Sequence, residues 1–251
     1  MRAAPSTIAA FLLSALVAGP TRAEGLQLTP VIVELTRDQG NAILSLRNDT
    51  AAPVRYQLSA VTWDQDSAGQ LKLAPTKDLI LFPLLLALKA GEQRNVRVGV
   101  QPERFGAVEK TYRVFLDQLP SPDRPGNKPA VQVLTRVSIP VFLEPERSVP
   151  ALRIERAEIS QGKVSFQLQN VGNVRVRPTE IVADALSGNG TAVTRQRWDG
   201  WYVLAGADRA YEWPLPKQGC ERVRSVRIEA RLEGGKALAS ALELPGGACG
   251  P

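Results

Sequence analysis

The chain has 251 residues, a formal net charge of +6 and no histidine. Without histidine, a Ser-His-Asp or Cys-His nucleophile system is excluded, and no pair of carboxylates stands out that could take its place. The basic residues are spread along the chain, whereas a nucleic-acid-binding protein usually gathers them in one stripe. We therefore expect no enzymatic activity, no cofactor, no metal site and no nucleic-acid partner.

The N-terminal residues have the pattern of a secretory signal peptide. A basic residue precedes the apolar stretch 8–18, and small residues precede the expected cleavage point after Ala23. An uncleaved anchor is the alternative, but the stretch is shorter than the ~20 residues that a membrane helix needs. A second apolar run, 79–88, is shorter still and contains Pro83. We expect residues 1–23 to be removed on export to the periplasm, and no membrane insertion.

The chain has two cysteines, Cys220 and Cys249. An even number of cysteines in an exported protein indicates a disulfide. The loop that this bond closes has about thirty residues, which corresponds to roughly 3 kcal/mol of stabilisation in the chain-entropy model. Two cysteines without histidine do not complete a tetrahedral zinc site.

Nearly all of the mature chain has the pattern of short β-strands. These segments are rich in β-branched residues, and Gly, Pro, Asn or Asp residues bound them at the spacing of a β-sandwich. The expected strand segments are 26–35, 41–48, 54–63, 70–75, 95–102, 110–119, 152–159, 163–170, 174–186, 207–215, 223–232 and 236–244.

The strand pattern starts again after Pro150, and the two halves resemble each other. Residues 42–60 and 163–181 both contain a strand, an asparagine turn and a strand that opens on Val-Arg. Asparagine suits such turns because it bonds its own backbone and tolerates left-handed geometry. We therefore predict an all-β protein with two similar sandwiches, at residues 24–147 and 148–251.

The segment 130–145 is unusual because it predicts a long strand with one β-branched face. Val131, Val133, Thr135 and Val137 fall on alternate positions of it. Pro140 cannot donate a ladder hydrogen bond, so the strand should lie at an edge or be interrupted there. A long apolar edge strand is an aggregation hazard, so its presence needs a functional reason.

Three short motifs are better explained as turns than as functional sites. The segment 160–163 matches S-x-x-K but lacks the companion motifs of penicillin-interacting enzymes. The segment 64–69 opens like a calcium loop, but Pro75 replaces the glutamate of the twelfth position. Asn48 is formally a glycosylation acceptor, and a turn is the simpler interpretation.

An aromatic cluster lies between residues 197 and 213. Trp198, Trp201 and Tyr202 could form an exposed platform for sugars. Since buried aromatics dominate cores of this kind, we favour the interpretation that the rings fill the second sandwich or the domain junction.

Four segments in order resemble the periplasmic chaperones of chaperone–usher pilus assembly, the PapD-like family. Residues 26–48 resemble the opening strand, turn and second strand of that family, and residues 82–99 its Pro, apolar strand and closing V-R-V. Residues 111–120 resemble its Y-R-x-x-x-x-x-[IL]-P segment, and the strand 130–145 follows. The resemblance implies two immunoglobulin-like domains in a boomerang arrangement.

The resemblance also implies a function for the apolar strand. Chaperones of this family lend an edge strand to pilin subunits that lack their final strand, which is β-augmentation. The positions that match the donor residues are Val131, Val133 and Thr135, with Val137 as a further member. The implied partners are pilin subunits and an outer-membrane usher, and a second copy of the chain could cover the free edge until a subunit arrives.

The chain departs from the family pattern at the anchor for the subunit's terminal carboxylate. An Arg on the first strand and a Lys on the donor strand are usual, but Pro30 or Val31 and Pro140 hold those positions here. This departure resembles the divergent archaic or alternative branch, which includes spore-coat-like pili. We expect Arg97 and Arg136 to supply the charge, since an Arg fork binds carboxylate bidentately. Lys110 and Arg113 are the next basic residues to consider.

The main alternative is a two-domain immunoglobulin-like surface adhesin or carbohydrate-binding protein that uses the aromatic cluster. Such a protein would have no reason to keep the strand 130–145 apolar. An envelope hydrolase is a third hypothesis, which the missing catalytic motifs disfavour.

Overall fold

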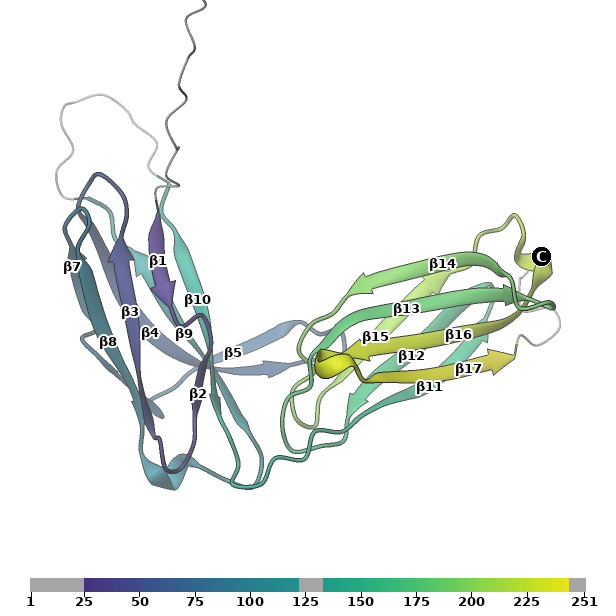
Figure 1. Cartoon of the computed structure of the whole chain (residues 1–251), viewed down its shortest axis with the longest axis horizontal. Helices are drawn as coiled ribbons and strands as arrows, with labels where there is room; N and C mark the ends of the chain where they lie inside the picture. Colours follow the sequence, from purple (N-terminus) through teal and green to yellow (C-terminus); the bar gives the residue numbers. More distant parts are fainter. Residues whose placement is uncertain (1–24, 122–132, 244–251) are drawn as a thin grey trace, which may run out of the picture.

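The computed structural model describes residues 25–121 and 133–243. The expected signal peptide, Val131 and Cys249 lie outside these residues. The described chain forms two β-sandwich domains that meet at an angle (Figure 1), which confirms the predicted all-β fold. No helix in the described ranges has the length and apolar character needed to cross a membrane.

The first domain packs a four-stranded sheet, in the order β1-β3-β8-β6, against a six-stranded sheet in the order β2-β10-β9-β4-β5, with β7 also paired to β4. All its pairs are antiparallel except β10 with β2. The strands are β1 (Leu26–Thr29), β2 (Val33–Leu35), β3 (Asn41–Asn48), β4 (Val54–Gln65), β5 (Leu71–Pro75), β6 (Leu79–Phe82), β7 (Leu85–Leu88), β8 (Gln93–Val100), β9 (Lys110–Gln118) and β10 (Arg136–Leu143), with a 3-10 turn η1 (Pro102–Arg104).

The second domain packs a three-stranded sheet, in the order β11-β12-β15, against a four-stranded sheet in the order β14-β13-β16-β17. Its strands are β11 (Leu152–Ser160), β12 (Lys163–Asn170), β13 (Pro178–Ser187), β14 (Ala192–Asp199), β15 (Asp208–Pro214), β16 (Val223–Leu232) and β17 (Ala237–Glu243), with 3-10 turns η2 (Cys220–Arg222) and η3 (Glu233–Gly235). The chain passes between the domains from Leu143 to Leu152.

Each core follows from the alternation of residues along the strands. In β3, Leu44 and Leu46 are fully buried while Ile43 and Arg47 face outward. In β12, Val164, Phe166 and Leu168 are buried on the same two-residue period. Because one face of each sheet is apolar, the two sheets of each domain pack face to face and exclude water.

The similarity between the two halves extends to hydrogen bonds. Asn48 ends β3 and Asn170 ends β12, and both side chains are 1% exposed. Each amide donates to the carbonyl four residues later and accepts from the backbone N–H two residues later, at 2.8–3.0 Å. Asn48 is therefore a structural turn residue, and its burial excludes it as an accessible glycosylation site.

The other two motifs also form turns. Gln161 and Gly162 have positive φ values of 50° and 71° between β11 and β12, which is the geometry of a tight hairpin. The side chain of Asp66 accepts hydrogen bonds from the backbone N–H groups of Ala68 and Gln70 at 3.0 and 2.9 Å. It thereby shapes the turn of the β4–β5 hairpin.

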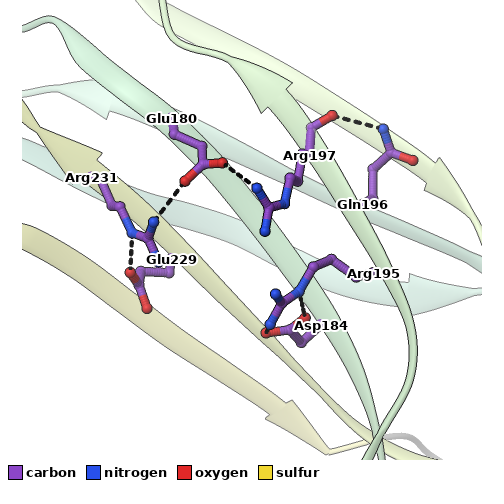
Figure 2. A network of polar contacts seen from close by, with 7 residues as sticks. All are labelled: Glu180, Asp184, Arg195, Gln196, Arg197, Glu229 and Arg231. Carbon is purple, nitrogen blue, oxygen red and sulfur yellow. Dashed lines mark hydrogen bonds and ion pairs between the residues drawn. The ribbon is translucent and has the colours of Figure 1, made fainter.

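A network of charged side chains covers the outer face of the β14-β13-β16-β17 sheet (Figure 2). Asp184 of β13 is 5% exposed and lies opposite Arg195 in one neighbouring strand and Arg227 in the other. Its carboxylate accepts from Arg195 at 2.5 and 3.0 Å and lies 3.6 Å from Arg227. The hydrogen bond from Arg195 holds the pKa of Asp184 below its ordinary value, although burial opposes this shift.

We predict that Asp184→Asn lowers the melting temperature at pH 7 by the equivalent of about 1–3 kcal/mol, since Arg195 then loses a charged partner. The pKa of Asp184 is lower in the folded protein than in the unfolded chain. Its stabilisation is therefore present above about pH 4 and is lost as the pH falls through the folded-state pKa. The difference between the two proteins should shrink in this acidic range. The exposed Glu212→Gln is the matched control, and equal melting of Asp184→Asn and wild type at pH 7 contradicts the prediction.

The disulfide remains a prediction because Cys249 lies outside the described residues. Cys220 is 3% exposed within the second core, where a cross-link would tie the following segment to the domain. Mass measurement of periplasmic protein without reductant should find both thiols oxidised, and reduction should lower the melting temperature by the equivalent of roughly 3 kcal/mol. Two free thiols in this protein would remove the prediction.

Candidate functional site: an open strand edge beside the domain junction

Strand β10 is paired along its whole length on one side only. Its register with β9 runs from Arg136 opposite Asp117 to Leu143 opposite Lys110. On its other side, β2 pairs only with residues 141–143. Among the described residues, no strand pairs with that edge over Arg136–Pro140. The predicted edge strand is therefore an edge before Pro140 and an interior strand after it.

The prediction that a strand begins at residue 130 is wrong for residues 133–135, because β10 starts at Arg136. The chain before it still contacts β9, since the N–H of Gln118 donates to the carbonyl of Thr135 at 2.9 Å. Both the N–H and the hydroxyl of Thr135 donate to the side-chain oxygen of Gln118. An alternating pattern predicts the faces of a strand, but ladder hydrogen bonds decide where the strand ends.

The expected donor residues lie in different environments. Val133 is 80% exposed, and Thr135 is also exposed. Val137 is half-buried and packs against the core of the first domain, on the same face as Ile139 and Val141. Val131 lies outside the described residues.

The backbone direction explains why Pro140 fits in this strand. The carbonyl of Thr135 points toward β9, and successive residues of a strand alternate between its two edges. Residues 136, 138 and 140 therefore present their backbone N–H and C=O groups to the open edge. Because residue 140 does not face β9, the missing N–H of Pro140 removes no hydrogen bond from the ladder with β9. The N–H groups available to a pairing strand end at Ser138.

An aromatic cluster joins the two domains at the end of this edge. Trp63 of β4 and Phe142 of β10 pack against Tyr202 of the second domain, with ring centroids 5.6–5.9 Å apart. The hairpin that follows Trp63 also holds the second domain. The side chain of Gln65 donates to the carbonyl of Tyr202 at 2.8 Å and accepts from the N–H of Leu204 at 3.0 Å.

An ion-pair network holds the other side of the junction. Arg175 of the second domain pairs with Glu109 and Glu34 of the first, and its guanidinium lies 3.6 Å from the centroid of Phe142. The side chain of Glu109 is fully buried. Burial raises the pKa of Glu109, and the charge of Arg175 opposes this shift. The buried carboxylate is stable in the fold because it has a charged partner.

Arg113 of β9 lies at the junction between the aromatic cluster and β10. It is 8% exposed, and its guanidinium carbon lies 4.0 Å from the centroid of Trp63. Its Nη1 donates to the hydroxyl of Ser138 at 3.0 Å. Burial lowers the pKa of Arg113, and the neighbouring Tyr202 acts in the opposite direction.

The two arginines that the sequence favoured as anchors are not brought together. Arg97 lies in β8 on the outer face of the four-stranded sheet, between Ile43 and Phe82 in the cross-strand register. Arg136 lies on the face opposite Val137, as expected, but it is exposed and pairs with Asp117. Arg175 and Glu109 were not identified from the sequence, because they lie 66 positions apart and meet only when the domains dock.

The aromatic segment does not form a sugar platform of three rings. Trp198 packs with Phe166 and Tyr211 in the second core, and Tyr202 belongs to the junction. Only Trp201 of the three is exposed, at 41%. The expectation that these rings fill the core and the junction is confirmed for Trp198 and Tyr202.

The fold is that of several solved chaperone structures. One match is the CsuC–CsuE chaperone–tip adhesion subunit pre-assembly complex from archaic chaperone–usher Csu pili of Acinetobacter baumannii. It has a TM-score of 0.57 and 18% identity, and covers 86% of this chain and 97% of that one. The class 5 fimbriae chaperone CfaA has a TM-score of 0.58 and 13% identity, and covers 88% and 100%.

A third match is the Salmonella enterica SafA pilin in complex with the SafB chaperone, with a TM-score of 0.57, 15% identity, and coverage of 90% of this chain and 99% of that one. At these identities the likeness establishes the fold. No match is found among curated protein sequences.

The sequence itself carries a family signature over the first domain and most of the connection that follows it. Residues 25–149 match the pili and flagellar-assembly chaperone family, PapD N-terminal domain. The match spans both sheets of the first domain and the strand β10 with its open edge. This is a family of assembly chaperones, not of enzymes. The chain therefore belongs to the PapD-like family of pilus-assembly chaperones.

Proposed function

We propose that this protein binds pilin subunits in the periplasm by lending them the open edge of β10 and then delivers them to an outer-membrane usher. One observation carries the proposal: the edge of β10 before Pro140 has no partner strand among the described residues, although the same strand is a core element of the first domain. An incomplete subunit sandwich could pair there and bury its own open groove.

The backbone of β10 supports pairing over a limited length. Arg136 and Ser138 present both an N–H and a C=O group to the open edge, and Pro140 presents only its C=O group. Pairing that begins near residue 133 would thus end at Pro140. Beyond that point β2 already occupies the edge.

The side chains support the same placement. Val133 is apolar and largely exposed, so its burial in an apolar groove of the subunit would contribute favourably to the free energy of binding. Val131 and Thr135 share its position in the alternating pattern. Val137 contacts the chaperone's own core, so we assign it a smaller part in filling the subunit than Val133.

We assign the chain to the divergent archaic or alternative branch of the family. The support is the sequence, where Pro140 replaces the usual lysine of the donor strand and Pro30 or Val31 replaces the usual arginine of the first strand. A proline at residue 140 cannot supply charge to a subunit carboxylate.

We also propose that the free protein covers its open edge by pairing with a second copy. Unpaired N–H and C=O groups on an apolar edge are a template for another chain. Subunit binding would then compete with self-association, and the free chaperone would be protected from uncontrolled aggregation.

Val133→Arg should remove subunit capture without unfolding the protein. The residue is 80% exposed, so the substitution disturbs no core contact, while a buried charge in the subunit groove is strongly unfavourable. The measurement is co-purification of co-expressed candidate pilins with the wild type and the variant, together with circular dichroism of each free protein. Val171→Arg is the matched control, because Val171 is 44% exposed and lies in the second domain.

Two outcomes would count against the donor assignment. If Val133→Arg unfolds the first domain, Val133 has a structural role. If the variant folds and captures pilins as the wild type does, the subunit binds elsewhere.

A further inference from the structure

The ladder between β9 and β10 ends in a contact that differs from an ordinary strand pair. Thr135 and Gln118 lie opposite each other when the register of these strands is continued. The N–H of Gln118 donates to the carbonyl of Thr135 at 2.9 Å, as in a ladder. The N–H of Thr135, however, donates to the side-chain oxygen of Gln118 at 3.2 Å, and its hydroxyl donates to the same oxygen at 2.8 Å. A glutamine side chain therefore takes the place of a backbone carbonyl at this end of the ladder.

The chain of β9 turns toward β4 directly after this contact. The N–H of Leu119 donates to the carbonyl of Arg55 at 2.8 Å, and the guanidinium of Arg55 donates to the carbonyl of Pro120. The continued register would place Pro120 opposite Val133, but a proline has no N–H to donate and its carbonyl is directed to Arg55. The ladder therefore ends at Thr135.

The segment before Thr135 is held by neither neighbouring strand. Val133 is 80% exposed and Leu134 is 44% exposed. No backbone hydrogen bond links either residue to another described residue. From Arg136 onward β9 supports the strand, and from Val137 onward the core of the first domain supports it as well. The contact with Gln118 thus marks the boundary between the ordered edge and the free segment.

A buried tyrosine adds to this contact. Tyr56 of β4 is 3% exposed and lies opposite Gln118 in the register of β4 with β9. Burial raises the pKa of Tyr56, and a hydrogen bond with the Thr135 side chain opposes this shift. The hydroxyl of Thr135 is thus bound by residues of its own domain, whereas the side chain of Val133 remains available to a partner.

We propose that Gln118 is a positioning residue for subunit capture, because its side chain holds Thr135 in the strand and so orders the start of the open edge before a subunit arrives. This inference rests on the proposed function. Ordering a chain segment during binding costs conformational entropy, and an edge that is ordered beforehand avoids part of this cost. Without the glutamine oxygen, the N–H of Thr135 would have only water as a partner, and the strand would fray toward Val137.

The test compares Gln118→Leu, which removes the acceptor at similar side-chain size, with Gln118→Glu, which keeps an acceptor oxygen. Gln169→Leu is the matched control, because Gln169 is an exposed strand residue of the second domain. Amide hydrogen exchange of each free protein is followed by NMR, residue by residue. The pilin that co-purifies with the wild type is then denatured and diluted into each chaperone, and the rate of complex formation is measured.

We expect the N–H of Thr135 to exchange about 3- to 10-fold faster in Gln118→Leu, while the N–H of Val141 in the interior of the ladder keeps its protection. Gln118→Leu should form the complex about 3- to 10-fold more slowly, because the edge must be ordered during binding. Gln118→Glu should recover most of this rate, and Gln169→Leu should match the wild type. Complex formation by Gln118→Leu at the wild-type rate would overturn the positioning role and leave the donor edge standing.

If the wild type captures no pilin at all, the proposed function fails, and the exchange measurement alone decides the role of Gln118. Faster exchange of the Thr135 N–H in Gln118→Leu, with protection kept in Gln118→Glu, would support the ordering of the edge by this side chain. Equal exchange of the Thr135 N–H in the wild type and both variants would overturn it.

Discussion

The packing of Trp63, Phe142 and Tyr202 is the contact on which the functional surface depends. These rings come from two strands of the first domain and a loop of the second, and all three are buried. Their packing, with the ion pair between Glu109 and Arg175, fixes the angle between the sandwiches that Figure 1 shows. Because β10 carries Phe142, the same contact fixes the open edge relative to the second domain.

Strand β10 both packs in the core of the first domain and presents an open edge, and different parts of the strand serve these two roles. Ile139, Val141 and Leu143 give it a core face, so it cannot be removed without losing the first domain. Its open edge must remain available for pairing, which is a hazard in a free protein. Pro140 limits the length of that edge, and the exposed ion pair of Arg136 with Asp117 places charge beside it. Both features are known defences against uncontrolled strand pairing.

The sequence was sufficient for most strands and turns because those depend on neighbours along the chain. Short segments bounded by turn residues predict β3 and β12, and the shared asparagine turn together with the restart after Pro150 predicts two related sandwiches. The start of β10 could not be predicted, since the alternation continues through residues that make no ladder. Which rings of the aromatic segment lie in the core, at the junction or on the surface depends on how the second domain folds and docks, so the sequence alone does not distinguish them.

The choice among the arginines shows where local patterns fail. Alternation with Val96 and Val98 places Arg97 on an outward face, but only strand pairing reveals that this face belongs to the four-stranded sheet, which does not include β10. Arg136 was placed on the correct face of its strand, yet Asp117 already neutralises it. The position of Arg113 depends on the register between β9 and β10, which no pattern within either strand reveals.

Arg175 and Arg113 show that two guanidinium groups contribute to one junction in different ways. Both lie over aromatic rings, at 3.6 Å from Phe142 and 4.0 Å from Trp63. Arg175 has a carboxylate from the other domain, so its charge contributes to holding the domains together. Arg113 has no carboxylate partner among the described residues, and its Nη1 donates to the hydroxyl of Ser138. The ring face of Trp63 and the hydroxyl of Ser138 stabilise this charge, so the two arginines hold the same junction by different contacts.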